Sequence, residues 1–281
     1  MKVYSEPEHI REVIRSWKDR CEKVVLVPTM GHLHQGHTSL IEQAQALGER
    51  VIVSIFVNPI QFNQQDDFTR YPRTLESDLT LLSTLDVDAV FAPSTETLYQ
   101  RGTQSALKII VPELAQMFDG EFRPGHFEGV CTVVCKLFNI TCPNIAVFGN
   151  KDYQQLLIIR RLVSELNFDI DIVAGETVRE ADGLAMSSRN THLSPEQRSV
   201  ANCLYTSLQR VKTDFTTDSI AELEQSAVIE LENAGMKVEY FNIRDARNLQ
   251  PVSQITEKIV VLSAVWLGET RLIDNILFST T

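Results

Sequence analysis

The sequence lacks the features that mark membrane-bound, secreted or nucleic-acid-binding proteins. No apolar run approaches the roughly 18 residues that a membrane-spanning helix needs. The first twenty residues, MKVYSEPEHIREVIRSWKDR, are charged throughout and have no apolar core of a signal peptide. Basic residues are also scarce, because 26 Lys and Arg stand against 37 Asp and Glu, for a net charge of −11. Neither nucleic acid nor a membrane is therefore an expected partner.

Cysteine is sparse and shows no pairing pattern. The number of cysteines is odd, their spacing is scattered, and no CxxC pair occurs. A disulfide framework and a structural zinc site are therefore not expected, and a reducing compartment fits the composition. We expect a soluble, cytoplasmic protein. The five cysteines are Cys21, Cys131, Cys135, Cys142 and Cys203.

What the sequence does contain is a regular alternation of helical and strand patterns. A chain of 281 residues, 43% of them hydrophobic, buries a large core in one or two domains. Continuous apolar runs separated by amphipathic segments indicate a parallel sheet covered on both faces, an α/β fold. Strands are predicted at 24–28, 51–59, 88–93, 145–149 and 169–175, and helices at 6–20, 39–47, 74–86, 129–141 and 153–166.

The pattern changes after about residue 176. Ser194, Pro195 and Gln197 form the signature of a capping box, which predicts a helix running to about residue 211. A second helix at 219–235 is followed by strand patterns at 237–245 and 258–268. We therefore expect one domain over 1–176 and a smaller α+β domain over 177–281.

Polar residues follow three of the predicted strands at the point where each strand ends. His34 and His37 follow the first strand, Asn58 and Gln61 follow the second, and Lys151 with Asp152 follows the fourth. Ligands of open parallel sheets bind beyond the carboxyl ends of the strands. The sequence therefore predicts one ligand site built from three separate segments.

The stretch PTMGHLHQGHTSLI at 28–41 contains three of the six histidines. A zinc site is one interpretation, although the binuclear pattern that it resembles has Asp where this chain has Gly36. A phosphate site is a second interpretation, because Gly31 and Gly36 have P-loop spacing and a helix amino terminus attracts phosphate. A surface loop is the third, and it suits His32, as it suits His9, better than the other two histidines.

The H-x-G-H pattern of His34 to His37 resembles the signature of the nucleotidylyltransferase superfamily. EADGLAMSSRN at 180–190 is similar to the second phosphate loop of such enzymes, comparable to the K-M-S-K-S loop of class I aminoacyl-tRNA synthetases. SIFVNPIQF, RPGHFEGVCTVV and FGNKDYQQL then resemble the pantothenate synthetase (pantoate–β-alanine ligase) family, in order and spacing, so that the matches span residues 28 to 190. Asn150 departs from that family, which often has an acidic residue there.

The resemblance implies a fold and a reaction. The fold is a Rossmann-like, doubly wound parallel sheet with a smaller carboxy-terminal lid domain. The reaction condenses pantoate with β-alanine at the expense of ATP, through a pantoyl adenylate, and releases AMP and pyrophosphate. Mg²⁺ is expected to accompany ATP, with no protein ligand named, and a homodimer is expected, with the apolar segment 129–140 as a candidate interface.

The resemblance also implies roles for individual residues. His34, His37 and Lys151 would be catalytic, with His37 the candidate proton donor. Gly149 and Asp152 would hold the ribose, and the backbone of Val178 would face adenine. Gln61, Gln155 and Asn58 would bind pantoate and β-alanine. The expected ATP-binding set is Met30, Gly31, His32, Leu33, His34, Gln35, Gly36, His37, Gly149, Asn150, Lys151, Asp152, Val178, Met186, Ser187, Ser188 and Arg189.

Three other functions compete with this one. Another nucleotidylyltransferase would release a stable nucleotide-containing product. A zinc hydrolase would use His32, His34 and His37 as metal ligands. A nucleotide-binding regulator would bind ATP without turnover.

Overall fold

The computed structural model describes residues 1–63 and 65–280. The chain forms two compact units. The first contains residues 1–150 and 154–176, and the second contains residues 151–153 and 177–281. Each unit has its own sheet and its own hydrophobic core.

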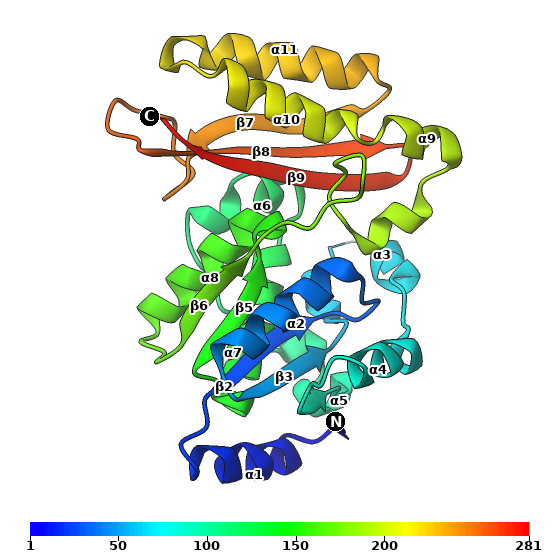
Figure 1. The fold of residues 1–281 in the computed structure, drawn as a ribbon, viewed down its shortest axis with the longest axis vertical. Helices are drawn as coiled ribbons and strands as arrows, with labels where there is room; N and C mark the ends of the chain where they lie inside the picture. The colour runs from blue at the N-terminus through cyan, green and yellow to red at the C-terminus, as the bar shows by residue number, and fades with distance from the viewer. Residues whose placement is uncertain (64, 281) are drawn as a thin grey trace. The chain divides into compact units, whose positions relative to one another are not determined.

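The first unit is built on a six-stranded parallel sheet (Figure 1). Its strand order is β1-β4-β3-β2-β5-β6, which confirms the α/β, Rossmann-like fold. The edge strand β1 was not predicted, because its three residues are too few to show a period. The strands are β1 (Lys2–Tyr4), β2 (Val24–Thr29), β3 (Arg50–Ile55), β4 (Ala89–Phe91), β5 (Ile145–Gly149) and β6 (Asp171–Gly175).

The strand order reverses between β2 and β5. From β2 the chain moves outward through β3 to β4, and it then returns to place β5 on the other side of β2. Doubly wound sheets bind their ligands in the crevice at such a reversal. The segments that follow β3, β2 and β5 therefore leave the sheet side by side at the edge where a ligand is expected.

Helices cover both faces of this sheet. Ile41 and Ala44 of α2 pack against β2 and β3 on one face, together with Leu82 of α4. On the opposite face α1 packs on α7 and β2. The helices are α1 (Pro7–Lys18), α2 (Gln35–Leu47), α3 (Gln65–Arg70), α4 (Leu75–Ser83), α5 (Thr95–Leu98), α6 (Asp119–Phe122), α7 (His126–Thr141) and α8 (Tyr153–Glu165), with short 3₁₀ turns η1 (Pro59–Gln61), η2 (Thr103–Ser105), η3 (Leu114–Gln116) and η4 (Asn150–Asp152).

The second unit is an antiparallel sheet, β7-β8-β9, with α10 and α11 packed on one face (Figure 1). Ser194 and Gln197 form the expected capping box. The helix predicted from there to residue 211 is interrupted at Ala201 and Asn202, where Leu204 N bonds to Ala201 O in a tighter turn. The elements are η5 (Ser188–His192), α9 (Pro195–Val200), α10 (Cys203–Asp214), η6 (Thr217–Ser219), α11 (Ile220–Asn233), β7 (Lys237–Asp245), β8 (Lys258–Leu267) and β9 (Thr270–Ser279).

Candidate active site

Two histidine rings cap the amino end of α2. His34 is the N-cap residue, and its Nδ1 accepts the backbone N–H of Gly36 at 3.1 Å. His37 makes the reciprocal hydrogen bond, because its Nδ1 accepts the backbone N–H of His34 at 3.3 Å. The centroids of the two rings are 4.2 Å apart. A ring nitrogen that accepts an N–H carries no hydrogen, so each neutral ring carries its hydrogen on Nε2. The helix start therefore presents two imidazole N–H donors.

The loop that leads into this cap is fastened by Asp78 of α4. The carboxylate is 3% exposed and accepts the backbone N–H groups of His32 at 2.9 Å and Leu33 at 2.8 Å. Gly31 lies beside it with a φ of +81°, and an added Cβ would meet Asp78 Oδ2 at 3.0 Å. Glycine is thus required here both for its backbone conformation and for the close approach. His32, with a φ of +51°, lies with Nδ1 3.5 Å from Thr74 Oγ1.

Met30, Asn58 and Gln61 are in contact beyond the ends of β2 and β3. Gln61 Nε2 donates to Met30 Sδ at 3.1 Å, and Asn58 Nδ2 donates to Gln61 Oε1 at 3.1 Å. Asn58 is 1% exposed and Gln61 is 7% exposed. The sequence placed Asn58 and Gln61 together after one strand, and they are in contact here, with Met30 joining them as a contact that was not predicted.

The backbone of Gln61 is held by the amino end of α7. His126 Nδ1 donates to Gln61 O at 2.8 Å, which leaves His126 Nε2 to accept from Arg123 Nη1 at 3.1 Å. Gly129 on the next turn approaches so closely that an added Cβ would meet Ile60 O at 2.5 Å. Any side chain at position 129 would therefore displace η1 and, with it, Gln61.

The two neighbouring glutamines of α8 have different surroundings. Gln154 is buried, and its amide is fully used: Nε2 donates to Leu114 O and Met117 O at 2.7 Å, while Oε1 accepts from Asp119 N at 3.1 Å. Gln155 is half-buried and makes no side-chain hydrogen bond within residues 1–63 and 65–280. The amide of Gln155 is thus the one available to a ligand.

The segment after β5 is divided between the units. Gly149 ends β5 and Asn150 follows it in the first unit, next to the carboxyl end of β2. Lys151 and Asp152 belong to the second unit, where the backbone oxygen of Lys151 accepts from Asn275 Nδ2 at 2.8 Å. Asp152 is exposed and Lys151 is half-buried.

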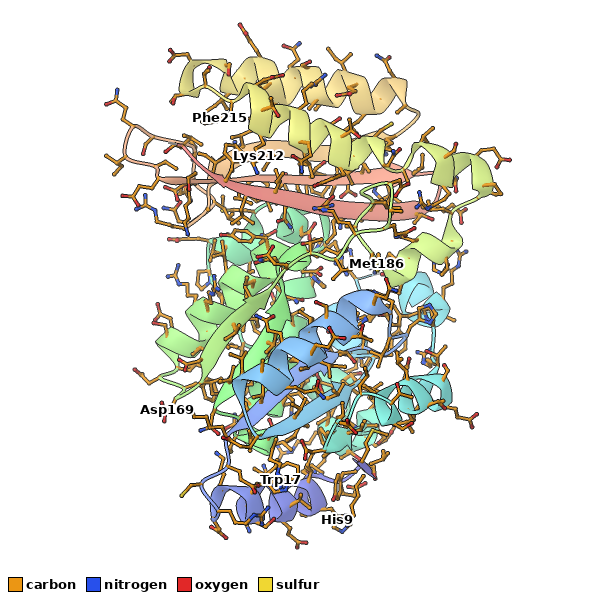
Figure 2. The ribbon with its side chains drawn as sticks, viewed as in Figure 1. His9, Trp17, Asp169, Met186, Lys212 and Phe215 are labelled. Atoms are coloured by element: carbon orange, nitrogen blue, oxygen red, sulfur yellow. The ribbon has the colours of Figure 1, made fainter. Side chains whose placement is uncertain are left out.

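The predicted second phosphate loop lies in the second unit, directly after a short hairpin. Met186 N donates to Val178 O at 3.0 Å, and Arg179 and Ala185 form a bridge. Ser187 then caps η5, with Oγ accepting from Arg189 N at 3.3 Å. Met186, Ser187, Ser188 and Arg189 are each half-buried, and Figure 2 labels Met186 in this loop.

Ion pairs anchor that hairpin at both ends. Arg179 pairs with Asp274 of β9 through contacts of 2.6 and 3.0 Å, and its guanidinium lies 3.7 Å from the centroid of the Tyr205 ring. Burial raises the pKa of the Asp274 carboxyl, and Arg179 opposes that rise. Arg198 pairs with Asp182 and, through that hydrogen bond, lowers the pKa of its carboxyl. These charges stabilise the shape of the hairpin.

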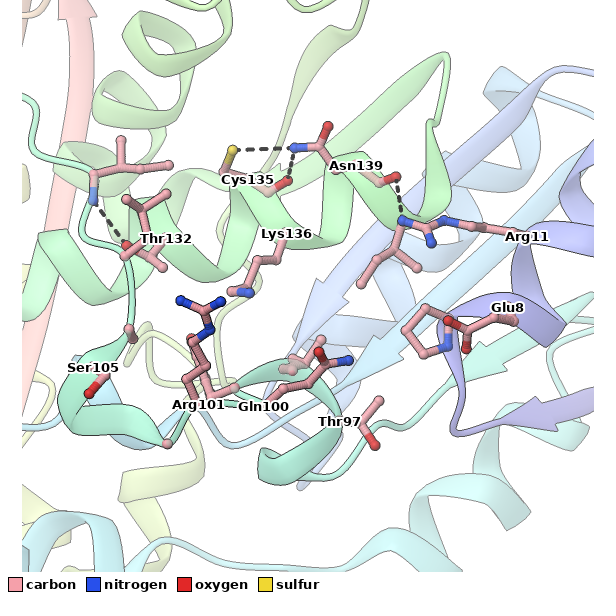
Figure 3. Close-up of a pocket in the computed structure, with 18 residues that line it drawn as sticks. Glu8, Arg11, Thr97, Gln100, Arg101, Ser105, Thr132, Cys135, Lys136 and Asn139 are labelled. Carbon is pink, nitrogen blue, oxygen red and sulfur yellow. Dashed lines mark hydrogen bonds between the residues drawn. The ribbon is translucent and has the colours of Figure 1, made fainter.

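A separate hollow of about 500 Å³ lies in the first unit between α1, α7 and the segment 97–109 (Figure 3). None of the predicted site residues lines it. Arg101 and Lys136 extend their cationic ends toward one another in it, and Lys136 Nζ also lies 5.3 Å from the Tyr99 ring centroid.

No helix in the described part of the chain is long and apolar enough to cross a membrane. Within residues 1–63 and 65–280, no group of three or more His, Cys, Asp or Glu side chains is arranged to hold a metal ion. The five cysteines are free thiols, of which Cys131 is buried.

Sequence reasoning missed Asp78, His126 and Gln154. Asp78 lies on a helix among other polar residues and has the pattern of a solvated face. His126 stands in the quoted stretch RPGHFEGV but carried no assignment there. Only for His126 did the sequence hold a signal, since a histidine that follows Pro-Gly three residues before a predicted helix is a candidate for a local hydrogen bond; the helix itself begins at His126.

Comparisons with known proteins agree with this arrangement. A family model described as pantoate-β-alanine ligase matches residues 2–277. A pantothenate synthetase of Shewanella denitrificans is 44% identical over 280 residues, which cover 99% of this chain and all of that protein. A crystal structure of the Thermus thermophilus pantothenate synthetase has a TM-score of 0.90 and 40% identity, and the match covers 98% of this chain and 99% of that one.

A second solved structure adds ligands to the comparison. It is the Francisella tularensis pantoate-β-alanine ligase, complexed with β-γ ATP and β-alanine. Its TM-score is 0.82 at 36% identity, and the match covers 99% of this chain and 97% of that one. The resemblance inferred from the motifs is thereby confirmed: the chain belongs to the pantoate–β-alanine ligase family and is an ATP-dependent ligase that condenses pantoate with β-alanine.

Proposed function

We propose that the phosphates of ATP bind at the amino end of α2, against His34 and His37. The observation that carries this proposal is their shared tautomer, since both rings accept a backbone N–H at Nδ1 and carry hydrogen on Nε2. Two imidazole donors and a helix amino terminus stabilise negative charge that develops at the α-phosphate. In this neutral form His37 is proposed to donate a hydrogen bond from Nε2 to a phosphate oxygen, because a neutral imidazole is too weak an acid to give up its proton.

The first chemical step joins pantoate to the nucleotide. A carboxylate oxygen of pantoate attacks the α-phosphorus, the bond to the bridging oxygen of the β-phosphate breaks, and pyrophosphate leaves. In the second step the β-alanine nitrogen attacks the acyl carbon, the acyl C–O bond breaks, the nitrogen loses a proton, and AMP leaves. Both steps depend on positioning and on charge neutralisation.

Pantoate and β-alanine are assigned to the amides at the strand ends. Gln61 and Gln155 donate N–H to pantoate, and Gln61 borders the β-alanine site. A neutral amide binds a carboxylate without the strong ion pairing that would weaken it as a nucleophile. Asn58 belongs to the same site, although its burial and its three hydrogen bonds give it an indirect part.

The remaining ATP-binding roles follow those that the family resemblance implies. Lys151 and the loop residues Ser187, Ser188 and Arg189 bind phosphate oxygens, since hydroxyls and fixed cations suit an anion. Gly149 and Asp152 hold the ribose, and the Val178 backbone faces adenine. On this proposal residues 1–176 bind nucleotide and pantoate, and residues 177–281 form a lid that excludes water from the acyl adenylate. The further ATP-lining residues are Met30, Gly31, His32, Leu33, Gln35, Gly36, Asn150 and Met186.

Mg²⁺ enters with ATP as part of the substrate. The described residues offer no cluster of metal-ligating side chains, and the carboxylate of Asp78 is already used by backbone N–H groups. Mg²⁺ commonly keeps several waters and binds nucleotide phosphates directly. The triphosphate oxygens and water are therefore its proposed ligands.

We also propose a cytoplasmic homodimer. The candidate helix α7 buries most of its apolar side chains within its own unit. The neighbouring segment 106–111 instead exposes Leu107, by 75%, and Ile110, by 55%. These side chains are better suited to cover one another in a two-fold contact. Light scattering measures the mass of the purified protein directly, and the wild-type chain should be a dimer while Leu107→Glu should be a monomer. A monomeric wild-type chain contradicts the proposal.

The catalytic assignment is tested by ATP–pyrophosphate exchange. Exchange is expected with pantoate present and β-alanine absent, and AMP release is expected only after β-alanine is added. His34→Ala and His37→Ala should each lower the exchange rate on the order of 10²-fold or more. His9→Ala is the matched control, because His9 is an exposed residue of α1 (Figure 2). Exchange that ignores pantoate, or full activity of His34→Ala, would overturn the assignment.

A further inference from the structure

The amide of Gln61 has two ends of nearly equal size, and only one of them suits a carboxylate ligand. The NH₂ end donates hydrogen bonds, whereas the carbonyl end only accepts them. A reversed Gln61 would direct lone pairs at the negative charge of the ligand. The surroundings of Gln61 must therefore select one of two orientations.

A single backbone carbonyl makes that selection. Gly129 O lies 3.1 Å from Asn58 Nδ2, and a carbonyl oxygen can only accept. The NH₂ end of Asn58 must therefore face Gly129. The other end, Oδ1, accepts from Tyr99 Oη at 2.8 Å, so both ends of this buried amide are satisfied in one orientation only.

The orientation passes from Asn58 to Gln61. The second hydrogen of Asn58 Nδ2 points to Gln61 Oε1 at 3.1 Å, so the carbonyl end of Gln61 is engaged in the interior. Its Nε2 is turned away, toward Met30 Sδ at 3.1 Å. A thioether is a weak acceptor, and the NH₂ group keeps most of its capacity to donate to a ligand oxygen.

We propose that Asn58 is a positioning residue, which directs the NH₂ group of Gln61 toward pantoate with a polarity set by the carbonyl of Gly129. This inference rests on the proposed function, in which Gln61 binds pantoate. The side-chain amide of Asn58 makes three hydrogen bonds, to Gln61, Gly129 and Tyr99, and its exposed fraction of 1% leaves little surface for the substrate. Asn58 therefore acts through Gln61 and not by contact with pantoate.

The test is Asn58→Asp, which keeps the shape and removes the donor. A carboxylate facing Gln61 attracts the NH₂ end, so Gln61 reverses and presents its carbonyl to the substrate. The KM for pantoate should rise by about 10- to 100-fold, the effect of losing a hydrogen bond to a charged group. The KM for ATP should change by less than about twofold, and this split separates positioning from a general loss of structure.

Tyr99→Phe is the matched control. It removes a hydrogen bond from the same asparagine, but on the carbonyl side, so Gly129 still holds the amide in its orientation. Asn58→Asp should lose more stability than Tyr99→Phe, because it buries a carboxylate against the carbonyl of Gly129, and only Asn58→Asp should show the selective rise in pantoate KM. Equal pantoate KM values for the two variants would overturn the proposal.

Gln61→Ala separates a failure of the inference from a failure of the proposed function. If Gln61→Ala leaves the pantoate KM unchanged, Gln61 does not bind pantoate and the proposed function is wrong at this residue. If Gln61→Ala raises it and folded Asn58→Asp does not, the positioning role is wrong. If Asn58→Asp does not fold, Asn58→Ser is the variant to measure. Its single hydroxyl hydrogen cannot bond to both Gly129 O and Gln61 Oε1, so the orientation of Gln61 should be lost. An unchanged pantoate KM in Asn58→Ser would refute the positioning role.

Discussion

The carboxylate of Asp78 offers the sharpest test of how the histidine loop is held. It accepts hydrogen bonds from His32 N, Leu33 N and Thr74 Oγ1, the last at 3.1 Å. In Asp78→Asn one of the two oxygens becomes an NH₂ group, which must face a donor. The orientation that keeps the most bonds leaves the N–H of Leu33 unpaired and opposed by the new amide hydrogens.

Asp78→Asn should lower the stability of the protein and loosen the loop before α2. An unpaired buried N–H costs about 1–3 kcal/mol, so the free energy of unfolding should fall by about 2 kcal/mol. Domains are typically stable by about 5–15 kcal/mol, so the variant remains folded. A displacement of about 1 Å at the reacting groups lowers a rate by roughly 10²-fold. Pantoate-dependent ATP–pyrophosphate exchange should therefore fall by about that factor, far beyond what the lost stability explains.

Asp88→Asn is the control for this prediction. Asp88 also accepts a backbone N–H, that of Val51 at 2.8 Å, and a hydrogen bond from Arg50 at 2.6 Å, but it directly precedes β4 and contacts the amino end of β3, at the opposite edge of the sheet from the histidine loop. It should lose comparable stability, measured by urea unfolding, and keep its exchange rate within about twofold. Full activity in folded Asp78→Asn would refute the reasoning. If Asp78→Asn does not fold, Thr74→Val, which removes one of the three donors, should still slow exchange severalfold, and no slowing would count against it.

Two further predictions concern titrating groups. Burial raises the pKa of the Cys131 thiol to about 12, so this thiol should react with a thiol reagent at pH 8 only after unfolding, whereas the exposed Cys21 should react in the native protein. Prompt labelling of Cys131 in the native protein, located by peptide mass, would contradict this prediction. The Arg247 side chain holds the pKa of the Asp245 carboxyl near 2, below its usual 3.8, so its contribution is present above about pH 4 and is lost as the pH falls toward 2. Asp245→Asn should therefore be about 2 kcal/mol less stable than wild type at neutral pH, and this difference should close near pH 2 in denaturant titrations; a difference that persists there would show that the charge is not its cause.

The sequence predicted the sheet well because its strands are buried on both faces and read as continuous apolar runs. Two boundaries were wrong by four residues: the strand predicted over 51–59 ends at Ile55, and the start of α2, placed near Ser39 by the apolar period, lies at Gln35. Propensities favour Ser, Thr, Asp and Asn at the N-cap position, and a histidine there gives no such signal. The cap exists because two imidazole rings exchange hydrogen bonds with the backbone, which is visible only in three dimensions.

For the site, the sequence predicted neighbours that follow from the order of the strands, and it missed contacts made by single side chains. Strand order places the segments after β2, β3 and β5 at one edge, and of the residues expected there Asn58 and Gln61 are in contact in the first unit, whereas Lys151 and Asp152 belong to the second unit. Asp78 lies 45 and 46 positions from the N–H groups that it accepts. No period or spacing links residues so far apart, because the link is one carboxylate turned inward from a helix.

The histidine cap and the proposed chemistry both require the two rings to be neutral, with hydrogen on Nε2. An imidazolium would carry hydrogen on both nitrogens, and its Nδ1 could no longer accept the backbone N–H that it now holds. Protonation would therefore break the cap, and losing a cap costs about 1 kcal/mol of helix stability. The neutral ring keeps the cap and still offers Nε2–H to a phosphate oxygen. Because the hydrogen bonds that hold each ring also place its donor hydrogen, little reorganisation is left for the moment when charge develops on the α-phosphate.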